Sequence, residues 1–448
     1  MKRTATRAMQ YWVRVTRGDS TVARNTWLTV GARYIITAMA AGSAVIVATQ
    51  LGAKGAGTYA QVRVLPTVIA ALLGGGLTIA TPYFIGAKRY STQAIYETSL
   101  FLGTVLSLVG WGGWMLAGPL LHTHVYTQLS PQAVLAVGLA IPLQILCNYL
   151  NSIQQGLQDF KGANLVLIAE EFCAFVLVLP LLAGVSVGPT TIVVSAVVST
   201  GLAALLAAVL LWRNHGLRPW VRFHRDIAVA SIHFGIRGHI GRVANMLNWR
   251  LDVMMLSFLA PVEVVGSYAV ASKVAELFRP VSASLTFVLR PMIAALPVDQ
   301  ARQKGIELYR RYFAGNLVAV AVMAFAGGPV ILRFFGPEFA SAVPAFHILL
   351  FGLAALGASG VLNGFNVGIG KPEFNSYTAL VGMVVTVVGD VALIPTYSLM
   401  GAAVVSSAAY TAKAIALTGL FMANSGVTLP ELIGLREVRP KEYRADAV

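Results

Sequence analysis

The stretch R-V-A-N-M-L-N-W-R-L-D-V-M-M-L at 242–256 continues to the turn G-S-Y-A at 266–269. When the chain is shifted by 209 residues, this stretch overlies an earlier one. Arg242 then coincides with Arg33, and the turn coincides with G-T-Y-A at 57–60. Self-similarity at one fixed offset, close to half the chain, predicts a protein of two related halves.

The composition identifies the environment of both halves. Of the 448 residues, 57% are hydrophobic and 11% are charged, and the mean hydropathy is +0.72. A soluble domain carries roughly a quarter charged residues, so this chain cannot cover a water-facing surface. Apolar runs recur from Thr26 to Met422. They reach about 20 residues, which at about 1.5 Å per residue crosses a hydrocarbon core of about 30 Å. The sequence predicts an all-α polytopic membrane protein.

We expect twelve transmembrane helices in two pseudo-twofold-related six-helix bundles around a central cavity. The expected spans are 27–50, 58–85, 95–121, 131–156, 163–184, 188–212, 232–258, 265–294, 311–334, 342–368, 374–395 and 400–422. The expected division is 1–26 (basic N-terminal segment), 27–213 (first bundle), 214–231 (basic cytoplasmic linker), 232–422 (second bundle) and 423–448 (cytoplasmic tail). With six spans per half, both halves have the same orientation in the membrane.

The placement of lysine and arginine predicts that orientation. With a cytoplasmic N-terminus, 22 of the 33 basic residues lie in cytoplasmic segments, and the opposite face holds Lys54 and Arg333. The net charge of +15 therefore reflects topology and lipid contact and does not imply nucleic acid. The basic first 25 residues form either an interfacial helix on anionic lipid or a disordered tail.

Charged residues also remain inside the expected spans. The basic ones are Arg33, Arg63, Arg237, Arg242, Arg250, Lys273, Arg279, Arg290 and Lys413, and the acidic ones are Glu170, Glu171, Asp252, Glu276 and Asp390. A charge at the bilayer centre costs at least about 2.5–3.5 kcal/mol, so such residues usually face a cavity or a partner. Snorkelling to the interface is the alternative, and it fits Arg290 and Lys413 best. For the set as a whole we expect a cationic cavity.

Helical spacing sorts these residues further. One polar stripe in the seventh span consists of Arg237, Gly241, Asn245, Asn248 and Asp252, which recur every three or four residues. Interhelical hydrogen bonding alone is the other interpretation of this stripe. In the eighth span, Lys273, Glu276 and Arg279 share one face just before Pro280. That proline should kink the helix.

These positions suggest roles in binding an anion. Arg33 and Arg242, at equivalent depth in the two halves, are expected to form a symmetric clamp, because guanidinium groups bind phosphate oxygens bidentately. The remaining candidate substrate-binding residues are Arg63, Asn245, Asn248, Arg250, Lys273 and Arg279.

A second set of residues suggests ion coupling. Asp252, Glu276 and Asp390 are the candidates for exchanging a proton or a sodium ion, and a purely structural ion pair with Lys273 or Arg279 is the alternative. No catalytic residue, metal site or other cofactor is expected.

Five segments carry a resemblance to a known family. They are N-W-R-L-D-V-M-M-L-S-F-L-A at 248–260, V-G-S-Y-A-V-A-S-K-V-A-E-L at 265–277, F-G-P-E-F-A-S-A-V-P-A at 335–345, V-L-N-G-F-N-V-G-I-G-K-P at 361–372 and A-L-I-P-T-Y-S-L-M-G-A-A at 392–403. The chain resembles the bacterial polysaccharide (O-antigen type) flippases of the multidrug/oligosaccharidyl-lipid/polysaccharide exporter superfamily. The likeness covers most of the chain and is strongest from about 245 to 420.

The resemblance implies two bundles in a V shape that open alternately to each side of the bacterial inner membrane, with both termini cytoplasmic. The cargo would be a polyprenyl-pyrophosphate-linked oligosaccharide, moved from the cytoplasmic to the outer leaflet. The implied partners are this glycan lipid, the bilayer, and the polymerase and glycosyltransferases of O-antigen or exopolysaccharide synthesis.

Two alternatives remain. An ion-coupled drug antiporter of the same superfamily would be expected to carry an excess of carboxylates in its cavity, whereas bases outnumber acids inside the spans by nine to five. A membrane-embedded glycan polymerase or ligase would need an outer loop domain, and the connections on that face are short. We therefore expect a transporter and not an enzyme.

Overall fold

The computed structural model describes residues 20–183, 188–277, 298–368 and 373–436. In chain order the elements are α2 (Ser20–Leu73), α3 (Leu77–Gly86), α4 (Thr92–His124), α5 (Pro131–Val137), α6 (Ala140–Gly156), α7 (Phe160–Val178), η1 (Leu179–Ala183), α8 (Gly188–His215), α9 (Arg225–Leu259), α10 (Val262–Glu276), α12 (Val298–Phe334), η2 (Pro337–Phe339), α13 (Ala342–Gly368), α14 (Glu373–Ser425) and α15 (Leu429–Ile433). No strand occurs in these ranges.

Eight of the described helices are long and apolar enough to cross a membrane. The prediction of an all-α multi-pass membrane protein is therefore confirmed. The count of twelve spans stays a prediction, because the end of the expected span 265–294 lies outside the described residues.

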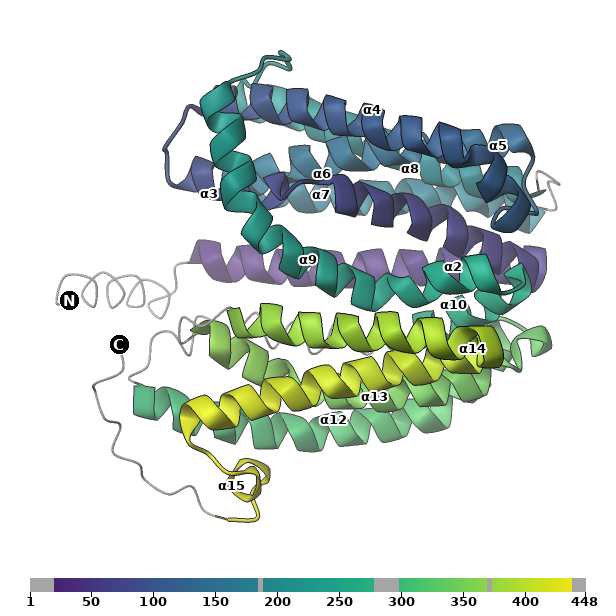
Figure 1. Cartoon of the computed structure of the whole chain (residues 1–448), viewed down its shortest axis with the longest axis vertical. Coiled ribbons are helices and arrows are strands. Elements are labelled where there is room, and N and C mark those ends of the chain that lie inside the picture. The colour runs from purple at the N-terminus through teal and green to yellow at the C-terminus, as the bar shows by residue number, and fades with distance from the viewer. Residues whose placement is uncertain (1–19, 184–187, 278–297, 369–372, 437–448) are drawn as a thin grey trace.

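Two of these elements each contain two helical segments that are joined by a sharp turn and so form a helical hairpin. α2 has 54 residues and α14 has 53, which as straight helices of about 80 Å would exceed a hydrocarbon core of about 30 Å. The chain turns at Gly52 (φ 64°, ψ −165°) and at Ser398 (φ 48°, ψ −122°). In Figure 1 the second half of α2 runs back beside the first half. Each turn falls between two of the predicted spans.

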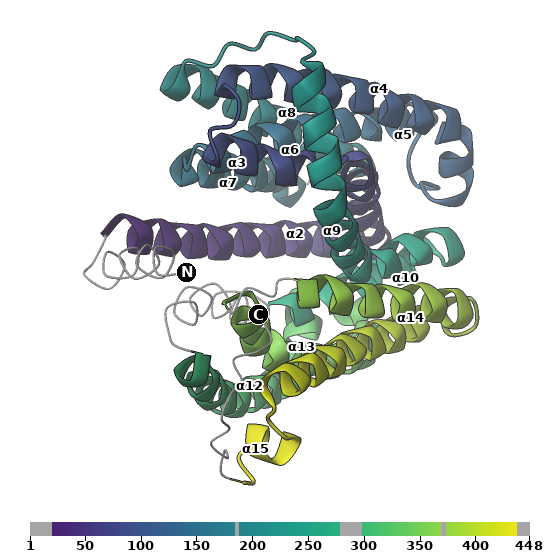
Figure 2. The ribbon, with the colours of Figure 1, turned by 60° about the vertical axis from the view of Figure 1, so that its left-hand side comes forward.

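The helices form two bundles (Figure 1). The first contains α2 to α8 and the second contains α10, α12, α13 and α14. α9 belongs to both, and Figure 2 shows it passing from beside α4 down to α10 and α14. The change of partner is visible along one face of α9: Gly238 lies against Ile79 of α3, whereas Gly241 lies against Ser376 of α14.

The chain before α9 is fastened to the first bundle. The amide of Gln93 donates to the carbonyl of Arg218 at 2.8 Å, and Gln93 accepts from the backbone N–H of Arg218 at 3.1 Å. The His224 ring lies 2.9 Å from the carboxylate of Glu97. α9 begins at Arg225, earlier than the predicted span 232–258, because this anchored linker leads directly into its first turn.

The bundles approach most closely at the repeated turn identified in the sequence. A Cβ added to Gly57 would lie 2.0 Å from the carbonyl oxygen of Val262, and one added to Gly266 would lie 2.1 Å from that of Ala53. Gly266 and Val262 are Gly57 and Ala53 shifted by the repeat offset of 209. The contact is therefore reciprocal, as a pseudo-twofold axis between α2 and α10 requires, and only glycine lets the two backbones meet.

Polar contacts surround this glycine crossing on the same end of the molecule. The carboxylate of Glu338 in η2 accepts from the backbone N–H of Ala53 at 3.2 Å. Lys54 forms an ion pair of 3.4 Å with Glu263. Both contacts join α2 to the second bundle, so this end of the interface between the bundles is closed.

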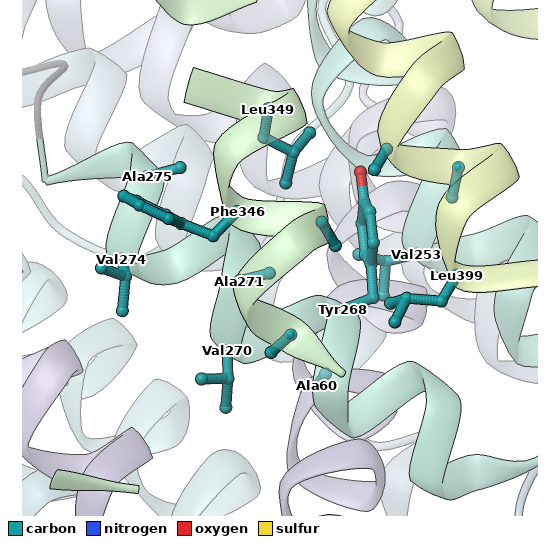
Figure 3. Close-up of a cluster of buried hydrophobic side chains, with 14 of the residues drawn as sticks. Ala60, Val253, Tyr268, Val270, Ala271, Val274, Ala275, Phe346, Leu349 and Leu399 are labelled. Carbon is teal, nitrogen blue, oxygen red and sulfur yellow. The ribbon is translucent and has the colours of Figure 1, made fainter. Parts of the chain in front are cut away.

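A hydrophobic core runs across the crossing. It includes Ala60 of α2 together with Tyr268, Val253 and Phe346 of the second bundle, all of which are buried. Figure 3 shows Tyr268 beside Val253 and Leu399, with its hydroxyl pointing away from them. Burial of such side chains contributes about 1.5–3 kcal/mol each, and this core fixes the register of α10 against α2.

Candidate functional site

A cavity of about 530 Å³ lies between the bundles, bounded by α2, α7, α9 and α10. Its charged lining residues are Arg33, Arg63, Glu171, Arg250, Lys273 and Glu276. The wall that α2 provides is built from small side chains, among them Ala40, Ala44 and Ala56. Small residues leave the space, and long basic side chains reach into it. The cavity predicted between the two halves is therefore present and carries more bases than acids.

One arginine of the cavity is held in a bidentate ion pair. The two terminal nitrogens of Arg63 donate to the two carboxylate oxygens of Glu171, at 2.9 Å and 2.7 Å. The nitrogen Nη1 of Arg63 also donates to the hydroxyl of Tyr59 at 2.7 Å. The Glu171 side chain is 8% exposed and that of Arg63 is 31% exposed. Arg63 thus forms a fixed, nearly planar donor surface at the cavity wall.

The opposite wall carries Arg250, Lys273 and Glu276. Arg250 lies 3.8 Å from the carboxylate of Glu276, a loose pair that leaves much of the guanidinium available. Lys273 makes no hydrogen bond or ion pair with any residue that the structure describes, although it borders the cavity. Lys273 is half-buried, and an ammonium group at a cavity wall favours an anion in that cavity.

The predicted polar stripe of α9 points elsewhere. The amide oxygen of Asn245 accepts from the ammonium group of Lys413 at 2.7 Å, and that of Asn248 accepts from the Thr386 hydroxyl at 2.9 Å. Both contacts lie between α9 and α14, so Asn245 and Asn248 face the interior of the second bundle and do not line the cavity. The expectation that Lys413 snorkels is wrong, because its side chain is buried against Asn245.

Two of the candidate acids are buried inside the second bundle. Asp252 is the last residue of this stripe on α9, and Asp390 belongs to α14. The Asp252 carboxylate accepts from the hydroxyls of Tyr268 and, at 3.0 Å, Ser406. Asp390 is fully buried, and neither of its carboxylate oxygens has a hydrogen-bond partner in the described part of the chain. Glu276, the third candidate, lies instead in the cavity beside Arg250.

The predicted clamp of Arg33 and Arg242 is not assembled here. Arg33 lines the cavity, but Arg242 donates to the Thr78 hydroxyl of α3 at 2.7 Å and is absent from the cavity wall. The physical reason is the crossing of α9, whose early turns lie on the first bundle. Arg279, Arg290 and the Pro280 kink fall outside the described residues.

Sequence reasoning missed Glu171 and Tyr59 as site residues. Glu171 was recognised as a charge inside a span, but Glu170 stands beside it, and spacing alone could not decide which of the two faces the cavity. The structure separates them: Glu170 accepts from the Thr200 hydroxyl of α8 at 3.0 Å, on the far side from Arg63. The usable signal was Arg63 itself, because a buried arginine requires a carboxylate nearby.

A second hollow of about 820 Å³ lies between α3 and α9. The rings of Tyr83 and Phe234 stack there at 4.3 Å, and Arg89 and Arg225 lie at its edge. This hollow is separate from the cavity between the bundles, and none of the predicted site residues lines it.

The fold is similar to that of solved transporters of the MOP superfamily. An inward-facing multidrug resistance transporter of the MATE family matches with a TM-score of 0.70 at 15% identity, covering 87% of this chain and 94% of that one. The lipid II flippase MurJ, inward closed, matches with a TM-score of 0.70 at 13% identity, covering 92% and 94%. A MOP superfamily transporter from Pyrococcus furiosus, described as having a binding pocket of reverse polarity, matches with a TM-score of 0.62 at 15% identity, covering 92% and 96%.

The profile of the family described as polysaccharide biosynthesis protein matches residues 22–296. The chain belongs to this family, and the predicted resemblance is confirmed. An uncharacterised membrane protein of Methanocaldococcus jannaschii is 27% identical over 200 residues, covering 42% of this chain. The match spans only 38% of the length of that relative.

Proposed function

We propose that the protein is a flippase that moves a polyprenyl-pyrophosphate-linked oligosaccharide from the cytoplasmic to the outer leaflet of the bacterial inner membrane. The observation that carries this proposal is the charge of the cavity. Four basic side chains face two acidic ones, a formal surplus of two positive charges. A pyrophosphate diester carries about two negative charges, and arginine and lysine supply the donors that its oxygens accept.

The shape of the interface supports alternating access. The cavity is closed at the glycine crossing of Gly57 and Gly266 and reaches past Arg63 to Arg33, which is exposed. With the orientation predicted from basic residues, the closed end faces outward and the cavity faces the cytoplasm, where the glycan lipid is made. A cationic drug would meet a surplus of like charge here, so the antiporter alternative gains no support from this cavity.

The buried acids of the second bundle are the proposed coupling site. Asp252 and Asp390 are both buried and neither lines the cavity, and Asp390 has two unsatisfied oxygens in the described structure. Two buried carboxylates that form no ion pair with a described residue favour the uptake of a cation, either a proton or sodium. Glu276 is the remaining candidate and would act from the cavity itself.

Reconstitution tests the proposed cargo. Purified protein in liposomes should translocate a fluorescent polyprenyl-pyrophosphate oligosaccharide, measured by the fraction of label that an impermeant quencher reaches. Lys273→Gln should lower the rate about tenfold or more, because a charged contact to the pyrophosphate is lost. Lys54→Gln removes the same charge from the exposed outer ion pair and is the matched control. Equal rates for these two variants and the wild type would refute the role of the cavity.

Labelling of introduced cysteines tests the proposed orientation. Thr123 and Tyr397 are exposed at turns of one predicted face, and Gln303 is exposed near the start of α12 on the other. Thr123→Cys and Tyr397→Cys should react with an impermeant thiol reagent in intact cells, and Gln303→Cys should not. The reverse pattern would invert the proposed direction of transport.

A further inference from the structure

The ion pair with Glu171 occupies the anion-binding face of Arg63 in the cavity wall. A carboxylate that faces a guanidinium with two parallel hydrogen bonds occupies the same two donors that a phosphate group uses. Both bonds are formed here, at 2.9 Å and 2.7 Å. An anion that enters the cavity therefore finds the donor face of Arg63 already filled by Glu171.

The surroundings of the pair allow the carboxylate to leave while Arg63 stays. The Tyr59 hydroxyl holds Nη1 of the guanidinium from the same helix, four residues away, at 2.7 Å. Glu171 itself borders the cavity, so its released carboxylate still meets water. Neighbouring Glu170 differs in this respect, because it is tied to Thr200 and does not line the cavity.

The repeat shows that this arrangement is confined to one half. Shifted by the offset of 209, Arg63 corresponds to Ser272, which lines the same cavity. The second half therefore presents a hydroxyl where the first presents a guanidinium. Beside Ser272 stands Lys273, which offers a single ammonium group and has no ion pair among the described residues. The first half thus provides Arg63, which can bind an anion through two nitrogens, and the second half provides Lys273, which binds through one.

We propose that Glu171 is an exchangeable counter-ion: it occupies the phosphate-binding face of Arg63 while the cavity is empty, and one phosphate group of the cargo displaces it. The second phosphate group then contacts Lys273. This inference rests on the proposed function, because it assumes a pyrophosphate cargo. Glu171 is accordingly a specificity-determining residue. An anion can replace its carboxylate only if two of its oxygens can accept from the two terminal nitrogens of Arg63.

No covalent step is involved, and charge is conserved by the exchange. Charged and titratable side chains around the pair are Tyr59 on α2, Glu170 on α7, Cys147 on α6 and, across the cavity, Lys273 on α10. Only the phosphate and the carboxylate change places. Arg63 keeps a bidentate anionic partner in both states, so its own guanidinium is never left without one.

Binding of inorganic pyrophosphate to the full-length protein in lipid nanodiscs, measured by calorimetry at one pH and salt concentration, tests the exchange. Glu171→Gln removes the competing charge and keeps the side-chain length, so its affinity should exceed that of the wild type about tenfold. Glu170→Gln removes a neighbouring charge that is not exchanged, and its affinity should stay within about twofold of the wild type. Adding Arg63→Lys to Glu171→Gln should cancel the gain, because lysine cannot form the fork.

The outcomes separate the inference from the proposed function. Equal pyrophosphate affinities for the wild type, Glu171→Gln and Glu170→Gln would overturn the exchange and leave the flippase proposal standing. Absence of pyrophosphate binding in all three proteins would overturn both. If Glu171→Gln does not reach the membrane in normal amount, Glu171→Asp replaces it. This shorter acid cannot reach both nitrogens, so it too should bind pyrophosphate more tightly than the wild type, and no gain would overturn the exchange.

Discussion

Substitution of Gly266 by alanine should open the closed end of the interface between the bundles. The added methyl carbon would lie 2.1 Å from the carbonyl oxygen of Ala53 and 2.8 Å from the backbone nitrogen of Gly57. Both neighbours are main-chain atoms of α2, so no side-chain rotation relieves the overlap. The helices must separate. Overpacking of this kind costs about 1–3 kcal/mol, which corresponds to a shift of about 5- to 150-fold in the balance between closed and open forms.

The shift can be measured through a cysteine in the cavity wall. Ser272→Cys, in a background in which Cys147 and Cys173 are replaced by alanine, places one thiol in the cavity. Its rate of reaction with an impermeant reagent added to intact cells should rise by the predicted factor when Gly266→Ala is present. The added exposure requires opening of the end that Gly57 and Gly266 now close.

A matched alanine substitution controls for general effects on helices. Gly419 of α14 has no atom within 4 Å of an added Cβ, so Gly419→Ala should not change the labelling rate and should raise helix stability slightly. If Gly266→Ala and Gly419→Ala give the same rate, the crossing does not hold this end of the interface closed, and the reasoning from the repeat is refuted.

Three further predictions concern other contacts. Glu338→Gln weakens the hydrogen bond from Ala53 by about 1 kcal/mol or less, so the labelling rate should rise less than with Gly266→Ala; no rise would show that Glu338 does not contribute to closure. Asp390→Asn should abolish dependence of transport on an ion gradient at normal protein level, and unchanged dependence would exclude Asp390 from coupling. Burial raises the pKa of Asp159, but hydrogen bonds from Gly162 and His215 outweigh it and keep that pKa below its ordinary value. Asp159→Ala should therefore lower thermal stability by about 1 kcal/mol at neutral pH. The difference should vanish as the pH falls through the lowered pKa, and a difference that persists in acid would contradict the role of the ionised carboxylate.

The repeat and the cationic cavity could be predicted because both depend on which residues occur and at what offset. The offset of 209 that aligns Gly57 with Gly266 also brings the two glycines together in space. Basic residues inside apolar spans must face a polar space, and Arg33, Arg63, Arg250 and Lys273 all border one. Neither inference needed to know how the helices are rotated.

The orientation of the polar stripe could not be predicted, because a helix in such a protein has two polar environments. Asn245, Asn248 and Asp252 do share a face, as their spacing indicates. That face meets Thr386, Ser406 and Lys413, so it could not be told from a cavity-facing one by sequence alone. Asp252 is buried for the same reason, since α9 and α14 pack along this stripe.

The pairing of Arg33 with Arg242 failed for a different reason. It assumed that the two repeats are symmetric along their whole length, whereas α2 and α9 begin differently. α2 lines the cavity from Arg33 onward. The early turns of α9 instead pack on the first bundle, where Arg242 donates to Thr78. Self-similarity in sequence predicts which positions of the two helices are equivalent. It does not predict that equivalent turns pack against equivalent neighbours.

The passage of α9 between the bundles has a mechanical consequence. The helix is continuous from Arg225 to Leu259, so it joins the two bundles covalently in addition to their contacts. If one bundle rotates relative to the other, α9 must bend between the segment packed on Ile79 and the segment packed on Ser376. Gly238 and Gly241 border that free length, and glycine lowers the resistance of a helix to bending. If the proposed alternating access takes place, the stiffness of α9 should limit how fast the cavity changes sides, independently of how tightly the cavity holds its cargo.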